Sequence, residues 1–191
     1  MSSSLISRTK TRVSYDARVL FLYPTEKVIV LFREMRRYKQ QMTEDECREI
    51  LDTETSGVLA VSGDDGYPYA VPMSFVCNDN KIYFHCAKSG HKLDAVKSES
   101  KVSFCVIHKD DVVPEDFTTY YKSVITFGRI RVIDDGEEMK AAAKLLGRKY
   151  FPLGTEEQLN DEISGSVNNM LILELQIEHM TGKMAKELIK K

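Results

Sequence analysis

The 191-residue sequence lacks the short motifs that mark the common hydrolases and nucleotide-binding enzymes. It has no Gly-x-Ser-x-Gly nucleophile motif and no phosphate-binding loop of the NTPase kind. It also has no pair of carboxylates in an arrangement suited to acid–base catalysis. No nucleophile, base or triad stands out, so the sequence leaves the catalytic residues unknown and gives no support to those enzyme classes.

Strong charge and paired cysteines are absent as well. The net charge of −2 and the pI near 6.1 give no electrostatic reason to expect nucleic acid or an anionic membrane as a partner. The four cysteines have neither the close spacing of a zinc site nor a disulfide pattern. We therefore expect no metal site, and we expect a reduced, cytoplasmic protein.

Residues 1–34 differ in character from the rest. Two short apolar runs, 19–23 and 28–32, are split by polar residues and Pro24. A membrane span needs roughly twenty continuous apolar residues, and the order of segments is not that of a signal peptide. We expect residues 1–34 to be an N-terminal extension, with Met35 as the natural start. Residues 35–191 then form one domain of common size.

Apolar periodicity predicts six strands and four helices. Strands are predicted at 57–61, 69–77, 81–87, 101–107, 120–133 and 170–177. Helices are predicted at 43–53, 91–97, 136–150 and 156–167, and capping boxes open the first and the last. Hairpin turns at 64–66 and 78–80 favour antiparallel pairing. The sequence therefore predicts an α+β fold, mainly β with helices, built on an antiparallel barrel of about six strands.

Three smaller features qualify this pattern. Pro68 and Pro72 lack an N–H donor, which fits an edge strand or a bulge better than a central strand. Gly128, inside a long strand, indicates a bulge or a close neighbour. Residues 114–119 are polar and predict a loop, which we expect to lie near the functional site.

The segment Lys88-Ser89-Gly90-His91-Lys92 has the composition of an anion site. It joins the strand 81–87 to a helix N-terminus, where free N–H groups and the helix dipole favour negative charge. A glycine allows close approach, and a hydroxyl and two ammonium groups are at hand. The residues alone predict a bound phosphate, and the alternative is a solvated surface loop.

The same region carries a family resemblance. The run Tyr-Pro-Tyr-Ala-Val-Pro-Met-Ser-Phe from Tyr67, followed by Ile-Tyr-Phe-His-Cys-Ala-x-x-Gly-His-Lys-Leu-Asp from Ile82, resembles the pyridoxamine 5'-phosphate oxidase-like superfamily in its nitroimidazole-resistance branch. The resemblance covers roughly residues 35–186. It implies an FMN-binding split β-barrel that forms a homodimer with FMN at the interface.

The resemblance also implies a role for individual residues. Lys92 would contact the FMN phosphate, helped by Lys88, Gly90 and His91. The backbone of Cys86 and Ala87 would meet the cofactor, and His85 would hydrogen-bond a flavin or substrate unless it is structural. Val71, Pro72, Met73 and Ser74 would border the ring, or belong to the core.

Two later residues extend this set. Ser123 would reach the flavin of the partner subunit, and the alternative is a serine that caps its own strand. Lys183, in Thr-Gly-Lys, would add a cation on the substrate side or be an exposed tail lysine. Tyr69 replaces the arginine expected in true pyridoxamine phosphate oxidases, so oxidation of vitamin B6 is not expected.

The leading functional hypothesis is an FMN-binding oxidoreductase that takes electrons from a small-molecule donor and reduces a small acceptor such as a nitro compound. The alternative is a non-catalytic flavin- or haem-binding carrier or sensor, with His85, His91 or His179 as iron ligands. The absence of a catalytic motif fits the first hypothesis, because a flavin carries out the chemistry itself.

Overall fold

The structure, a computed structural model, describes residues 32–166 and 169–189. The chain divides into two units, Met1–Phe32 and Arg33–Lys191, and only the second is described below. The predicted N-terminal extension falls almost wholly on residues 1–31, outside the described residues, and it stays a prediction. Val167, predicted in the last helix, also lies outside them.

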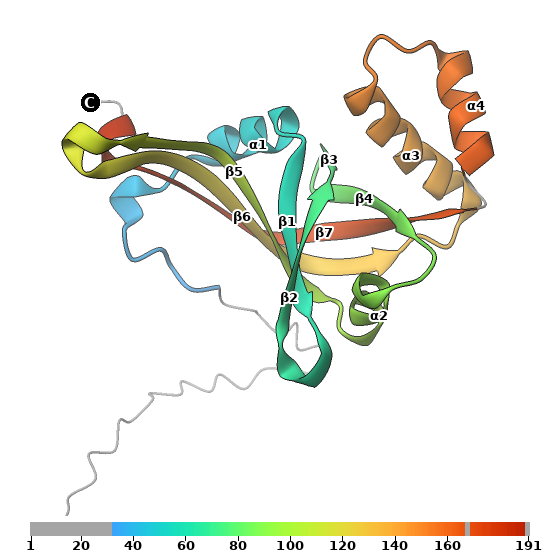
Figure 1. The fold of residues 1–191 in the computed structure, drawn as a ribbon, viewed down its shortest axis with the longest axis horizontal. Coiled ribbons are helices and arrows are strands. Elements are labelled where there is room, and N and C mark those ends of the chain that lie inside the picture. Colours follow the sequence, from blue (N-terminus) through green and yellow to red (C-terminus); the bar gives the residue numbers. More distant parts are fainter. Residues whose placement is uncertain (1–31, 167–168, 190–191) are drawn as a thin grey trace, which may run out of the picture. The chain divides into compact units, whose positions relative to one another are not determined.

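Seven antiparallel strands form one sheet in the order β2-β1-β5-β6-β7-β4-β3 (Figure 1). Their bounds are β1 Ser56–Ser62, β2 Pro68–Ser74, β3 Val76–Asn78, β4 Lys81–Ala87, β5 Lys101–Val113, β6 Thr118–Val132 and β7 Met170–Met184. Short hairpins connect β1 to β2, β3 to β4 and β5 to β6. The α+β class and the antiparallel sheet are confirmed.

The strand order shows that the sheet closes on itself. β2 and β3 stand at opposite ends of the order, yet only Phe75 separates them in the chain. The two edges must therefore meet at this residue, which makes the sheet a barrel with an opening rather than a flat layer. Beyond the three residues of β3, the edges of β2 and β4 are joined by no backbone pairing in the described part of the chain.

The break at Phe75 explains why there are seven strands and not six. The run 69–77 reads as one strand, but Phe75 is fully buried and its backbone leaves the ladder. Its N–H donates to the Tyr150 hydroxyl at 2.8 Å, and that hydroxyl donates to the Phe75 carbonyl at 3.1 Å. A side chain 75 residues away thus replaces the pairing that a continuous strand would make.

In the described part of the chain, four α-helices accompany the sheet: α1 Glu44–Thr53, α2 His91–Ser98, α3 Gly136–Tyr150 and α4 Glu156–Ser166. The capping box of Thr43 and Glu46 opens α1, and Thr155 and Gln158 form the reciprocal pair before α4. Both boxes satisfy N–H groups that have no partner within the helix. Short 3-10 turns cover Tyr38–Gln40, Asp64–Gly66, Pro114–Asp116 and Lys186–Leu188.

Two hydrophobic clusters hold these elements together. The larger fills the barrel and includes Leu59, Phe75, Phe84 and Phe104, all fully buried. The Phe104 ring packs edge-on against the rings of Phe75 and Phe84. The smaller cluster lies between α3, α4 and the outer face of β4 and β7, around Ile172.

Several local predictions are confirmed. The register shifts between Phe127 and Gly128, and a Cβ at Gly128 would overlap the Gln176 carbonyl. β2, which carries both prolines, is an edge strand. The turn after β5 is shorter than expected, because Thr118 already belongs to β6. Figure 1 shows this turn at the end of the β5–β6 hairpin away from α2, so it does not border the segment 88–92 of its own chain.

All four cysteines are free. Among residues 32–166 and 169–189, no helix is long and apolar enough to cross a membrane.

Candidate functional site

Lys92 brings the edge strand β2 and the helix α2 together. It is the second residue of α2, and its Nζ lies 3.1 Å from the Met73 sulfur. The Lys92 side chain is half-buried, and it has no carboxylate partner in the described part of the chain. A thioether is a weak acceptor, so this ammonium group is poorly compensated as it stands.

The residues before Lys92 provide N–H groups and space. Gly90 precedes α2 with φ of 126°, a conformation that L side chains rarely adopt, and a Cβ there would meet nothing within 4 Å. The first intrahelical bonds are those from Leu93 and Asp94 to the Gly90 carbonyl, at 2.9 and 3.2 Å. The N–H groups of His91 and Lys92 come before these bonds in the chain, so they have no acceptor within the helix. Lys88 and Ser89 are exposed in the same loop.

The end of β4 forms the other side of this loop. Cys86 is buried on the barrel side of the strand, and burial raises the pKa of its thiol while the charge of Lys92 lowers it. Met73, Cys86 and Lys92 therefore share one corner of the barrel, beside the opening between β2 and β4. Three predicted cofactor residues from three elements come together here.

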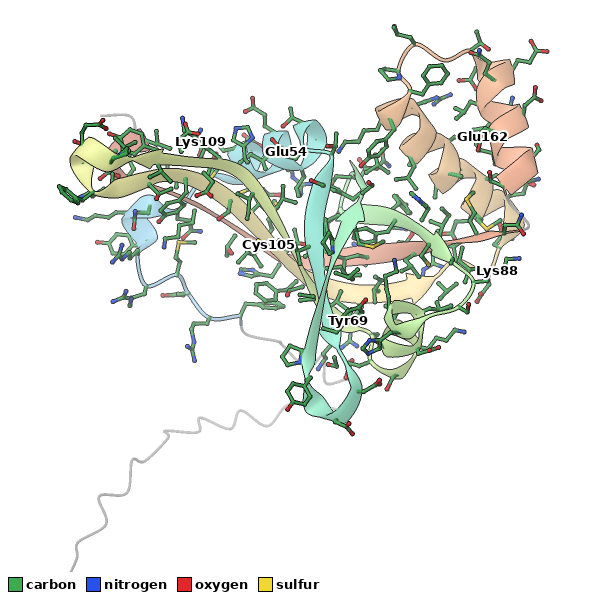
Figure 2. The ribbon with its side chains drawn as sticks, viewed as in Figure 1. Glu54, Tyr69, Lys88, Cys105, Lys109 and Glu162 are labelled. Atoms are coloured by element: carbon green, nitrogen blue, oxygen red, sulfur yellow. The ribbon has the colours of Figure 1, made fainter. Side chains whose placement is uncertain are left out.

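His91 has a structural contact of its own. Its ring stacks on Tyr69 of β2, with centroids 4.2 Å apart and an interplanar angle of 11°. Its Nε2 lies 3.6 Å from Asp64 in the exposed β1–β2 turn. Figure 2 shows Tyr69 on β2 near α2, and Lys88 beyond the end of β4. His91 thus fastens the helix start to the edge strand, while its backbone N–H stays available.

The outer face of the sheet carries a row of small and apolar side chains. Directly paired residues of antiparallel strands share a face, and the register aligns Pro72, Val58, Cys105, Ile125 and Thr181 across five strands. Ile125 is 38% exposed. We call this row, with Ile107 and Phe127 beside it, the outer sheet face. Val71 and Met73 point the opposite way, into the barrel, while Pro72 and Ser74 are exposed.

Ser123 lies on the same face of β6 as Ile125. It pairs with Ile107 and with Lys183, so the two predicted outlying residues are cross-strand neighbours. The Lys183 Nζ lies 5.3 Å from the centre of the Tyr121 ring. Ile130 of the same strand bonds to Ser100, just after α2. Seven residues of β6, or about 23 Å, therefore separate Ser123 from the C-terminal end of α2.

His85 lies apart from the other predicted site residues. It follows the alternation of β4, so its side chain and that of Cys86 are on opposite faces. His85 lines a pocket between α3, α4 and the outer face of β4 and β7. The structure therefore separates His85 from the Lys92 corner.

The sequence did not predict the stacking of Tyr69 on His91 or the apolar outer sheet face. A signal for the latter existed in β6, where Ile125 and Phe127 alternate with the buried Val124 and Thr126. Apolar residues on both faces of a strand indicate that both faces are covered. The Tyr69–His91 stack had no such signal, because it depends on where α2 returns to the sheet.

Comparison with known proteins identifies the family. The sequence model described as "Pyridoxamine 5'-phosphate oxidase" matches residues 43–184, which is most of the chain. The chain belongs to this family. No curated protein matches it.

Solved structures agree with the fold. A candidate 5-nitroimidazole antibiotic resistance protein from Bacteroides thetaiotaomicron superposes with a TM-score of 0.66 at 20% identity, covering 75% of this chain and 86% of that one. A conserved hypothetical protein from Mycobacterium tuberculosis gives 0.70 at 17% identity, covering 83% and 95%. An FAD- and heme-binding protein from Mycobacterium smegmatis gives 0.62 at 20% identity, covering 80% and 76%. At these identities the likeness concerns the fold, which is that of the split barrel.

Proposed function

We propose that the chain is an FMN-binding oxidoreductase that transfers electrons from a small donor to a small acceptor such as a nitro compound. One observation carries the proposal: the half-buried Lys92 ammonium has only the Met73 thioether as a partner among the described residues. A phosphate dianion at the start of α2 would compensate it. The fold of the candidate nitroimidazole resistance protein supports the choice of acceptor.

The residues present fit a flavin phosphate. Gly90 leaves room for close approach, and the His91 and Lys92 N–H groups precede the first intrahelical bonds. Lys88 adds a second cation, whereas Asp94 in the same helical turn is exposed. Val71, Met73, Cys86 and Ala87 flank the opening beside this corner. The cofactor supplies hydride and electron transfer, and these residues hold and orient it.

The homodimer is part of the proposal. The outer sheet face exposes Ile107 to 61% and Ile125 to 38% in a single chain, and a partner subunit would cover both. Ser123 and Lys183 lie on this face as a cross-strand pair. In the proposed dimer these two side chains would reach the cofactor of the partner subunit. Pro72, which pairs with Val58, extends this face onto the edge strand β2.

The haem alternative is supported less well. His91 is stacked on Tyr69, and the His179 ring lies 6.2 Å from that of Phe127. His85 faces an apolar pocket, but no lysine or arginine lines that pocket to pair with haem propionates. The M. smegmatis relative of the fold is described as binding both FAD and heme, so a spectrum must separate the two cofactors.

The first test is the visible absorption of the purified chain after incubation with FMN or with haemin and removal of the excess. The proposal expects that the protein retains a flavin absorption band at about 450 nm and retains no haem absorption band at about 400 nm. A colourless protein, with no thermal shift on adding FMN, contradicts cofactor binding.

Catalysis is tested separately from binding. The FMN-loaded chain is mixed anaerobically with NADH or NADPH, and bleaching of the flavin band is followed before a nitroimidazole is added. The proposal expects bleaching and then recovery of the band, with equivalent loss of the nitro compound. Stable flavin binding without recovery would instead make the chain a carrier.

A further inference from the structure

Tyr150, the last residue of α3, holds two separate backbone segments with one hydroxyl group. The hydroxyl accepts a hydrogen bond from the Phe75 N–H at 2.8 Å. Its single proton is within reach of two acceptors, the carbonyls of Phe75 and Thr55. Thr55 immediately precedes β1, and Phe75 immediately follows β2. Tyr150 therefore joins the two open ends of the β1–β2 hairpin, and it attaches both of them to α3.

Lys149 holds the side chain of the same residue, Phe75. Its Nζ lies 4.3 Å from the centre of the Phe75 ring and donates to the Leu51 carbonyl of α1 at 3.1 Å. Burial lowers the pKa of this ammonium group, so Lys149 differs from a solvated surface lysine. Its charge lies over an aromatic face, which is a favourable contact. The end of α3 thus holds the backbone of Phe75 through Tyr150 and the ring through Lys149.

The end of the hairpin that Tyr150 holds also carries Met73 of the Lys92 corner. Met73 pairs with Gly57 of β1, and the pairing of β1 with β5 covers only Val58–Ala60. On its other side, β2 has no ladder partner in the described part of the chain. Met73 therefore lies beyond the pairing that joins the hairpin to the rest of the sheet. The hydrogen bonds of Tyr150 hold this end at Phe75, two residues after Met73.

We propose that Tyr150 is a positioning residue for the Lys92 corner, and that its hydroxyl sets where Met73 lies relative to Lys92 across the opening of the barrel. Tyr150 acts through Phe75, because its hydroxyl bonds only to Phe75 and Thr55 among the described residues. The consequence for flavin affinity rests on the proposed function, but the position of Met73 can be measured without any flavin.

Tyr150→Phe removes the hydroxyl and keeps the ring. The Phe75 N–H then loses its acceptor, and the end of the hairpin is released from α3. Tyr120→Phe is the matched control, because the Tyr120 hydroxyl also donates a hydrogen bond, to Asp116 at 3.0 Å near the β5–β6 turn. Lys149→Met keeps the apolar stem and removes the charge over the Phe75 ring, so it tests the same end of α3 independently.

A second control separates positioning from general loss of stability. The Cβ added by Gly128→Ala would overlap the Gln176 backbone and meet Leu175, and none of the residues that Tyr150 holds is among its near neighbours. This variant therefore destabilises the sheet without removing a contact of Tyr150. Circular dichroism and thermal melting check that each variant is folded at the temperature of the measurements.

The first measurement is NMR of flavin-free protein labelled with carbon-13 at the methionine methyl groups. The Met73 signal is assigned by its loss in Met73→Leu. We expect Tyr150→Phe and Lys149→Met to shift or broaden the Met73 signal, and to leave the signal of Met184, the last residue of β7, unchanged. Tyr120→Phe and Gly128→Ala should leave the Met73 signal in place. If Tyr150→Phe does not fold, Lys149→Met decides.

The second measurement is the affinity for FMN, followed by flavin fluorescence quenching. Tyr150→Phe should weaken FMN binding about three- to tenfold, which is the size of effect expected from one neutral hydrogen bond, and Tyr120→Phe should leave it within about twofold. The two measurements together connect the position of Met73 to the binding of the cofactor.

Three results overturn the proposal. One is an unchanged Met73 signal in folded Tyr150→Phe or, if that variant does not fold, in Lys149→Met. Another is an equal change of the Met73 signal in Gly128→Ala, which would make the effect a general loosening of the sheet. The third is a displaced Met73 with unchanged affinity for FMN. If the parent chain binds no flavin, the proposed function fails, and the Met73 signal alone decides whether Tyr150 positions the corner.

Discussion

The ammonium group of Lys92 lies 3.1 Å from the thioether sulfur of Met73 and faces no carboxylate in the described residues. The two residues come from a helix start and an edge strand that meet beside the opening of the barrel. A half-buried cation with so weak an acceptor costs stability unless an anion joins it. The proposed phosphate site depends on this relationship.

Lys92→Met should stabilise the protein in the absence of any flavin. The methionine keeps the apolar stem and removes the poorly compensated charge, which we expect to contribute about 1 kcal/mol, or about 2–4 °C in Tm. Thermal melting of flavin-free protein measures the change. Lys97→Met, an exposed substitution in the same helix, should change the free energy of unfolding by less than about 0.5 kcal/mol. A clear loss of stability in Lys92→Met would show that the lysine is already well compensated.

Ile125→Asp should convert the proposed dimer to monomers. Ile125 lies on the outer sheet face, and its direct cross-strand partners are the uncharged Cys105 and Thr181, so a carboxylate buried there in an interface would have no directly paired cation. Sedimentation velocity with and without FMN checks the mass. Leu153→Asp, at a residue 91% exposed outside that face, is the control and should remain dimeric. If the Ile125 variant keeps the native mass, the interface lies elsewhere.

Gly128→Ala should destabilise the sheet by about 3 kcal/mol. The added Cβ would overlap the backbone carbonyl of Gln176, and this backbone cannot move aside as a flexible side chain could. Urea unfolding followed by circular dichroism measures the effect. Gly136→Ala meets no atom within 4 Å and should change the free energy of unfolding by less than about 0.5 kcal/mol. Equal stability of the two variants would show that the bulge between β6 and β7 relaxes freely.

Glu174 should make stability fall in acid. Its burial acts to raise the pKa of the carboxyl, but hydrogen bonds from Arg131 at 2.9 Å and Lys81 at 2.8 Å outweigh burial and lower it. The unfolded state then binds more protons between the unfolded pKa near 4.5 and the lower folded pKa. This stabilisation is complete above about pH 5 and is lost as pH falls through the folded pKa.

Urea unfolding between pH 7 and pH 3 measures that dependence. Glu174→Gln should be less stable than the parent chain at pH 7, because Arg131 and Lys81 lose a charged partner, and its stability should fall less steeply in acid. Glu157→Gln, an exposed substitution, controls for the change in net charge. Parallel acid profiles for Glu174→Gln and the parent chain would assign the acid dependence to other groups.

Most of the fold follows from local sequence patterns. Capping boxes at Thr43 and Thr155 determine where helices begin, and the turns at Asp65 and Asp79 adopt the left-handed conformation expected of tight hairpins. The break at Phe75 could not be predicted in this way. It depends on the Tyr150 hydroxyl, which reaches the strand from the far end of α3.

Part of the candidate site could also be predicted from local sequence patterns. Gly90, His91 and Lys92 are adjacent in the chain, and a helix start after a strand is a local signal. The grouping of Met73 and Cys86 with Lys92 depends on barrel closure. The family resemblance adds His85 to this group. Strand alternation places its side chain on the face opposite Cys86, at a pocket formed by helices about 60 to 80 residues later in the chain.

The most direct test of the central claim compares the affinities of FMN and riboflavin for the parent chain, Lys92→Met and the control Lys97→Met, measured by flavin fluorescence quenching. Riboflavin has the same ring and no phosphate. The proposed contact predicts that Lys92→Met weakens FMN about 10- to 150-fold, as expected for a charge-assisted hydrogen bond, and leaves riboflavin within about twofold. Lys97→Met should change neither. FMN affinity unchanged by Lys92→Met, or an equal loss for FMN and riboflavin, would contradict the assignment of Lys92 to the phosphate.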